Sequence, residues 1–146
     1  MSSRLENYLA LPELDNGEVV YRALKPPYWN SEKNRGTSKA FSGQEISVSR
    51  EKILPYAETV KLFQSKIKGV QALCSITVAE ILECASRQQA IVLKVIEKRS
   101  TNNPAHAEIV GFKEDFSYFL DIPQSVGAKI IKKATLHTFG ENLSSL

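Results

Sequence analysis

Alternating apolar and polar positions predict several strands along the chain. Residues 18–24 (EVVYRAL) are β-branched and aromatic-rich, and their alternation places Val20, Arg22 and Leu24 on one face of a strand. Residues 46–49 (ISVS) and 70–76 (VQALCSI) predict two more strands. The almost continuous apolar run at 90–96 (AIVLKVI) is typical of a central strand buried on both faces, with residues 105–111 as its partner.

Apolar residues at helical spacing predict helices between these strands. Thr77-Val-Ala-Glu80 forms a capping-box pattern, which predicts a helix over residues 77–87. Similar spacing indicates helices near residues 3–11, 55–67, 113–120 and 122–134. The pattern predicts an α+β fold in one compact domain over residues 1–146, with a mixed or antiparallel sheet of about 4–5 strands and about 3–4 helices. The polar end, 141–146, is expected to fray.

The segment 25–44 (KPPYWNSEKNRGTSKAFSGQ) shows neither the alternation of a strand nor the spacing of a helix, so we predict a long loop there. Pro26 and Pro27 disfavour helical backbone at its start. Loops of this length are generally functional or disordered. We therefore take it as the first candidate for a working surface.

The distribution of charge singles out the same segment. The chain has 19 basic and 16 acidic residues, a net charge of +3. Residues 25–44 hold four cations, Lys25, Lys33, Arg35 and Lys39, against one acid, Glu32, so this segment carries the whole excess.

Several classes of protein are not indicated. The two cysteines, Cys74 and Cys84, lack the spacing of a disulfide framework or a zinc site. No secretory signal and no membrane-spanning run is visible. We expect a cytoplasmic protein that binds no membrane, no metal and no cofactor. The sequence leaves the oligomeric state open.

Binding chemistry is concentrated in residues 25–44. Its cations could neutralise phosphates, and Tyr28 and Trp29 could stack on unpaired bases. Ser38 and Lys39 in Gly36-Thr-Ser-Lys39 offer a hydroxyl and an ammonium, although the spacing of a P-loop is absent. The alternative is a solvated loop whose Trp and Tyr pack back on the core.

A second basic cluster lies near the C-terminus. Lys129, Lys132 and Lys133 occupy one face of the last predicted helix. Such a run is often only a solvated face. If this helix lies beside residues 25–44, the two clusters form one positive surface.

A third group of residues could carry catalysis. His106 and Glu108 share a strand face, and a histidine near a carboxylate can act as an acid–base. Arg22 and Arg50 are arginines at or next to strands that could hold an anion. A hydrogen-bonded structural histidine is the alternative for His106, and Cys74 is expected to be a core residue.

Three segments in this order are similar to small bacterial proteins: Tyr21-Arg22 with Gly36–Phe41, Ile46–Arg50, and Asn103–Ile109. The chain resembles, over residues 20–111, an uncharacterised family of bacterial single-domain proteins. The resemblance implies a bacterial single-domain protein and brings no activity with it.

Two functions follow as hypotheses. The first is a non-catalytic binding module that engages a polyanion (nucleic acid) or an acidic partner protein through the basic aromatic loop. The second is a small toxin-like enzyme, a nuclease or transferase acting on RNA or a nucleotide, with His106 as the acid–base and Arg22 stabilising charge. The distance between His106 and Arg22 in the fold would distinguish these two hypotheses, because the enzyme requires both residues in one cleft.

Overall fold

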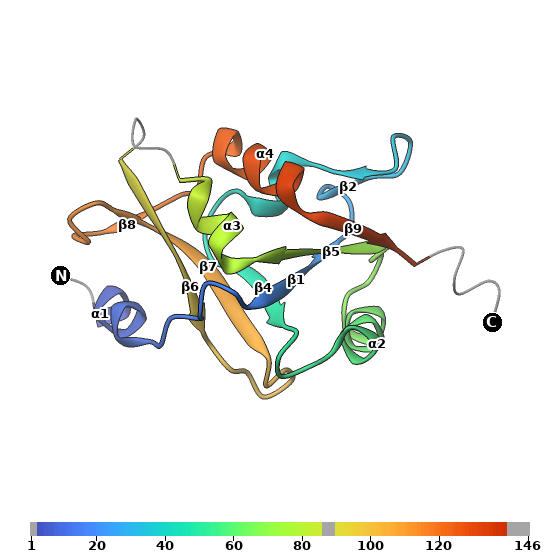
Figure 1. Cartoon of the computed structure of the whole chain (residues 1–146), viewed down its shortest axis with the longest axis horizontal. Helices are drawn as coiled ribbons and strands as arrows, with labels where there is room; N and C mark the ends of the chain where they lie inside the picture. Colours follow the sequence, from blue (N-terminus) through green and yellow to red (C-terminus); the bar gives the residue numbers. More distant parts are fainter. Residues whose placement is uncertain (1–2, 86–89, 140–146) are drawn as a thin grey trace.

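The computed structural model describes residues 3–85 and 90–139, which build a seven-stranded antiparallel sheet with helices on both faces (Figure 1). The strand order is β6-β7-β4-β1-β5-β9, and β8 pairs with β7 beside this path. The strands are β1 (Val19–Leu24), β4 (Ile46–Arg50), β5 (Ala72–Thr77), β6 (Ile91–Glu97), β7 (His106–Lys113), β8 (Phe119–Leu120) and β9 (Thr135–Thr138). The predicted α+β class is confirmed.

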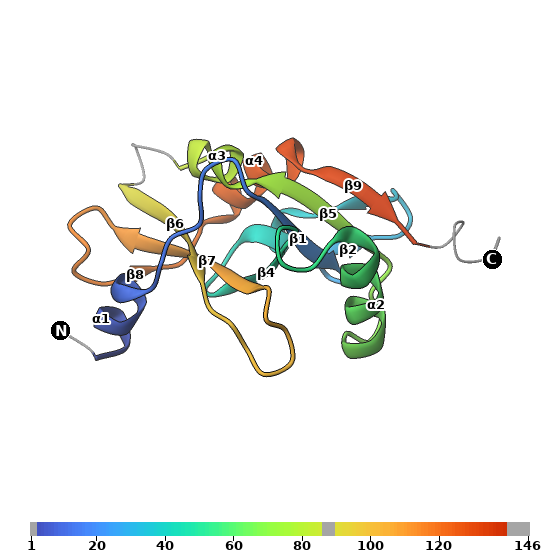
Figure 2. The ribbon, with the colours of Figure 1, turned by 60° about the horizontal axis from the view of Figure 1, so that its bottom comes forward.

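Alternate residues of the strands enter cores on opposite faces of the sheet. Val20 and Leu24 of β1 join a core completed by α3 (Val78–Glu83) and α4 (Gln124–Lys133). On the other face, Tyr21 packs with Phe63 of α2 (Tyr56–Lys66), while Phe112 of β7 packs with α1 (Ser3–Ala10). Figure 2 shows α1 and α2 at opposite ends of this second face.

The capping box predicted at residue 77 is confirmed. The Thr77 hydroxyl accepts the Glu80 backbone N–H at 3.2 Å, and the Glu80 carboxylate accepts the Thr77 backbone N–H at 3.1 Å. The Thr77 backbone N–H and hydroxyl both donate to the Glu80 carboxylate, and these two bonds lower the pKa of Glu80. Within the described residues α3 ends at Glu83, and the predicted end at residue 87 lies outside them.

Three details of the predicted sheet were wrong. It has seven strands instead of about 4–5, and β8, with two residues, is too short to show an alternation. Residues 91–97 form an edge strand, whose outer side bonds to the backbone of residues 12–14. Residues 113–120 form a turn and β8 instead of a helix, because Phe116 has a φ of +60° and Phe119 pairs with Phe112.

The segment 25–44 contains more regular structure than its pattern indicated. β2 (Trp29–Asn30) and β3 (Arg35–Gly36) form a hairpin, and η1, a 3-10 helix, follows at Ser38–Phe41. The turn between the strands needs a positive φ at Asn34, a residue type that tolerates it. The predicted frayed tail, 141–146, lies outside the described residues.

Candidate functional site

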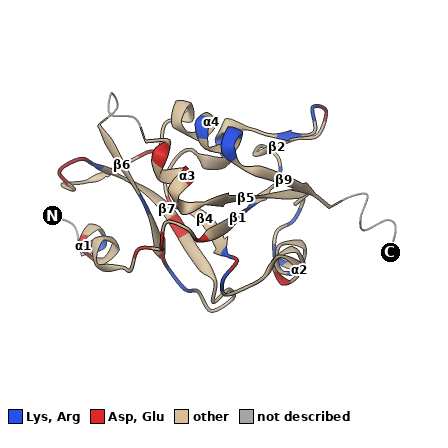
Figure 3. Cartoon of the chain, viewed as in Figure 1, with Lys and Arg blue, Asp and Glu red and all other residues tan. Residues whose placement is uncertain are grey.

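A groove of about 630 Å³ lies between the β2–β3 hairpin and the C-terminal end of α4. Arg35 and Gly36 come from the hairpin, and Lys132 comes from the last turn of α4. Cys74 of β5 and Leu136 of β9 also line it. The fold thus brings together the two basic clusters that the sequence places far apart (Figure 3).

Two glycines allow the close approach of these elements. A Cβ on Gly127 of α4 would lie 2.5 Å from the Ser38 carbonyl oxygen and 3.1 Å from that of Phe41. A Cβ on Gly36 would lie 2.7 Å from the Ile131 side chain. Because 2.5 Å and 2.7 Å are far below a normal contact, larger residues would push α4 away from η1 and from the hairpin.

The groove is positively charged and carries no compensating acid. Its lining includes Arg35 and Lys132 and, among the described residues, no Asp or Glu. Lys129 and Lys133 are exposed on the same helix, and Lys133 pairs with Glu83 of α3 at 3.3 Å. Arg35, Lys129 and Lys132 form no ion pair within residues 3–85 and 90–139.

The aromatic half of the predicted loop site is not exposed. Trp29 is only 5% exposed and packs in the core, so its ring has no open face on which a base could stack. The cause is the hairpin, which turns this side chain inward. Tyr28 is half-buried, with the Arg22 guanidinium carbon 4.7 Å from its ring centroid. The site retains its cations and loses its stacking surface.

Of the remaining loop candidates, only Ser38 lines the groove. Lys33 and Lys39 are exposed, and Lys25 is half-buried. Ser38 lines the groove, and its hydroxyl lies 3.4 Å from Oε1 of Gln124 at the start of α4. These positions leave the cations available to a ligand.

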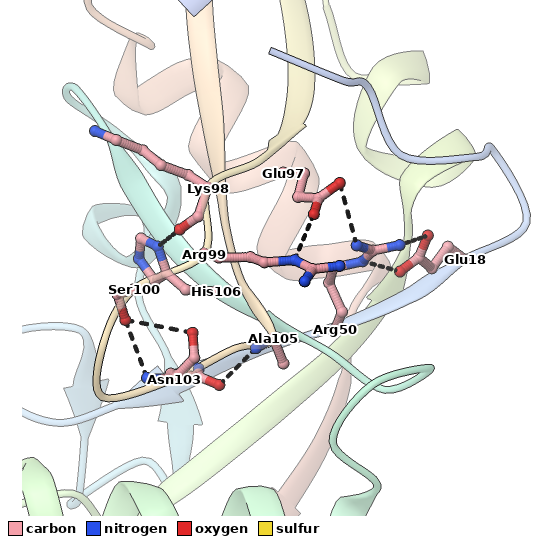
Figure 4. A network of polar contacts seen from close by, with 9 residues as sticks. All are labelled: Glu18, Arg50, Glu97, Lys98, Arg99, Ser100, Asn103, Ala105 and His106. Carbon is pink, nitrogen blue, oxygen red and sulfur yellow. Dashed lines mark hydrogen bonds and ion pairs between the residues drawn. The ribbon is translucent and has the colours of Figure 1, made fainter.

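Arg50 is engaged in a partly buried ion-pair network instead of an open site (Figure 4). Its Nη2 donates to Oε2 of Glu18 at 3.1 Å, and its Nη1 lies 3.8 Å from Oε2 of Glu97. The Glu18 carboxylate raises the pKa of Arg50. This pairing engages the guanidinium that the sequence analysis named as a possible anion contact.

Arg22 differs from Arg50 because no carboxylate pairs with it in the part of the chain that the structure describes. Its Nε donates to the Ala40 carbonyl oxygen at 2.8 Å and its Nη1 to that of Ser47 at 2.9 Å. β1 pairs with β4 only up to Tyr21, so the guanidinium occupies the place where the two strands part. Burial lowers the pKa of the Arg22 guanidinium.

His106 and Arg22 line one smaller groove, of about 180 Å³, beside α2. Nδ1 of His106 lies 2.7 Å from the Lys98 carbonyl oxygen, which only accepts, so Nδ1 carries a proton (Figure 4). Nε2 of His106 has no partner among the described residues. Glu108 instead accepts from Tyr8 at 3.0 Å and pairs with Lys98.

The two histidines belong to different places. Nε2 of His137 on β9 lies 3.1 Å from the Ser75 hydroxyl. Three strands separate β9 from β7. At a normal strand spacing His137 is therefore roughly 19 Å from His106.

Other chemistry is limited in the described chain. Burial raises the pKa of Cys74 to about 12, so its thiol is a core residue as predicted and not a nucleophile. No three His, Cys, Asp or Glu side chains of residues 3–85 and 90–139 come together as metal ligands. No helix in these ranges has the length and apolar character needed to cross a membrane.

Sequence reasoning missed several residues of the two grooves. Gly127, Ile131 and Leu136 shape the first, and Lys66 and Phe63 line the second. None carries a local signal, because glycine in a helix and lysine on a helix surface are ordinary. Comparison of the chain with protein-family models, with curated proteins and with solved structures finds no match.

Proposed function

We propose that the protein is a non-catalytic binding module that holds a nucleic-acid strand by its phosphates in the groove between the β2–β3 hairpin and α4. One observation carries the proposal: Arg35 and Lys132 line the same groove, and no acidic residue among the described ones balances them. Phosphates are the ligands that such exposed cations neutralise most effectively.

The geometry supports phosphate contacts over base contacts. Trp29 is buried and Tyr28 is covered by Arg22, so neither provides an open ring. Binding by cations alone is insensitive to sequence and sensitive to salt. The expected partner is therefore a nucleic-acid strand recognised without base specificity.

The test is binding of single-stranded RNA and DNA across a salt series. The test variant carries Arg35→Gln, Lys129→Gln and Lys132→Gln. If each cation meets one phosphate, the log–log slope of affinity against salt should fall in magnitude by about 2. The wild-type slope should be the same for oligonucleotides of different sequence.

A matched variant controls for net charge. Lys52→Gln, Lys61→Gln and Lys68→Gln remove three exposed cations away from the groove lining. The control should retain the wild-type affinity and slope. Equal losses in both variants would contradict a localised site. Binding of poly-glutamate without binding of nucleic acid would indicate an acidic protein partner instead.

The toxin-like enzyme remains a second proposal because His106 and Arg22 line one groove. In that proposal Nε2 of His106 is the acid–base, since its Nδ1 is held by Lys98. The guanidinium of Arg22 already donates to two backbone carbonyls, which weakens its assignment to transition-state charge. Cleavage of labelled RNA by the wild type but not by His106→Gln would support it.

A further inference from the structure

The groove beside α2 contains positive charge and no negative charge. Arg22 and Lys66 line it together with His106, and its lining includes no Asp or Glu among the described residues. Arg22 enters from β1, Lys66 from α2 and His106 from β7. Three separate elements therefore each contribute one nitrogen-bearing residue to the lining of this groove.

Arg22 lacks an internal counter-ion. Its partners are the carbonyls of Ala40 and Ser47 and the ring of Tyr28, all of which are neutral. A guanidinium has five N–H donors, and a charge held away from water without an opposite charge is costly. The lowered pKa of Arg22 has the same origin, which is desolvation. An anion in the groove would supply the missing charge.

His106 offers the second polar contact. Because Nδ1 donates to the Lys98 carbonyl oxygen, the ring is fixed. Nε2 donates to an oxyanion when the ring is the imidazolium, in which both nitrogens carry a proton. Lys66 is exposed at the last turn of α2, where its ammonium is free to move.

The remaining lining is mainly apolar, with Ser47, Asn102 and Asn103 as its polar residues, and the space is small. Its apolar part includes Val48 of β4 and Leu62 and Phe63 of α2. The volume of about 180 Å³ is below that of drug-sized ligand pockets, so it holds one small molecule and no chain segment.

We propose that this groove binds a small organic anion, with its oxyanion group at Arg22, Lys66 and His106 and its apolar body against Leu62 and Phe63. This site is separate from the nucleic-acid groove, since no residue lines both. It does not depend on the proposed nucleic-acid function.

The experiment titrates the full chain with benzoate, phenyl phosphate and benzamide while backbone amide NMR shifts are recorded. Benzoate or phenyl phosphate should shift the amides of Ser47, Phe63 and His106. Benzamide has the shape of benzoate without its charge, and it should bind at least about tenfold more weakly, the loss of one charge-assisted contact. The tighter of the two anions identifies the preferred oxyanion.

Single variants of the lining residues, with a control on α2, sharpen the test. Lys66→Gln should weaken binding of the anion about threefold, as expected for an exposed cation. Lys61→Gln, on the same helix but lining a different cavity, should leave it unchanged. His106→Phe should also weaken binding because it removes Nε2. Benzamide binding as tightly as benzoate, no shifts with either anion, or equal effects of Lys66→Gln and Lys61→Gln would overturn the proposal.

Discussion

The two grooves use the same kind of residue in opposite settings. Both are lined by cations, and neither lining includes an acid among the described residues. In the first groove Arg35 and Lys132 are exposed side chains on the hairpin and α4. In the second, Arg22 is desolvated and hydrogen-bonded to the backbone of η1 and β4.

Solvent decides what each cation does. An exposed cation is screened by water and salt, so it attracts a polyanion and adds little to stability. A desolvated guanidinium is held by acceptors that would themselves lose a partner if it were removed. Substituting the cations of the first groove should therefore leave the protein stable and lower its affinity for nucleic acid step by step. Substituting Arg22 in the second groove should destabilise the protein.

The largest expected effect is at Arg22. Arg22→Met removes two donors from the carbonyls of Ala40 and Ser47, which should lower the free energy of unfolding by about 3 kcal/mol. Urea denaturation measures this change. Arg35→Met on the exposed hairpin is the control, with an expected change within about 0.5 kcal/mol. Similar losses in the two variants would erase the distinction between the grooves.

The next effect concerns the contact between α4 and η1. Glycine to alanine in a helix normally stabilises by about 1 kcal/mol. At Gly127 the new Cβ would meet the Ser38 carbonyl oxygen at 2.5 Å, so Gly127→Ala should instead destabilise, by about 2 kcal/mol. It should also weaken nucleic-acid binding by displacing Lys132 from Arg35.

Thermal denaturation and the salt titration together check the Gly127 prediction. Gly17→Ala is a suitable control, because nothing lies within 4 Å of its added Cβ. A stabilised Gly127→Ala variant would show that α4 and η1 do not pack as closely as described.

A smaller effect is expected for single cations of the first groove. Lys132→Gln should reduce the magnitude of the salt slope for single-stranded nucleic acid by about 0.7, with stability unchanged. Lys61→Gln should leave the slope as it is. Filter binding or fluorescence anisotropy at several salt concentrations measures both, and equal slopes for both variants would remove Lys132 from the interface.

The smallest effect comes from a carboxylate next to the groove. Glu83 pairs with Lys133 at 3.3 Å between two exposed side chains. Glu83→Gln should free Lys133 and raise the affinity for nucleic acid about twofold, the scale of a surface ion pair. Glu58→Gln, on α2, is the matched control. A decrease in affinity would show that Lys133, once freed from Glu83, does not add to nucleic-acid binding.

Local patterns predicted those elements whose neighbours are close in sequence. The capping box at Thr77, the alternation of β1 and the burial of Cys74 follow from short-range spacing and side-chain chemistry. The same patterns were wrong for the edge position of β6 and for residues 113–120. Those features depend on which strand pairs with which, and a short strand such as β8 has no pattern of its own.

The sequence by itself determined the α+β class and the two basic clusters at residues 25–39 and 129–133. Only the tertiary structure decided that these clusters share a groove, because Gly127 and Gly36 permit a contact that no local rule implies. Tertiary structure also separated Arg50 from Arg22. One faces Glu18 and the other faces neutral backbone, and a charge takes its role from the groups that folding brings to it.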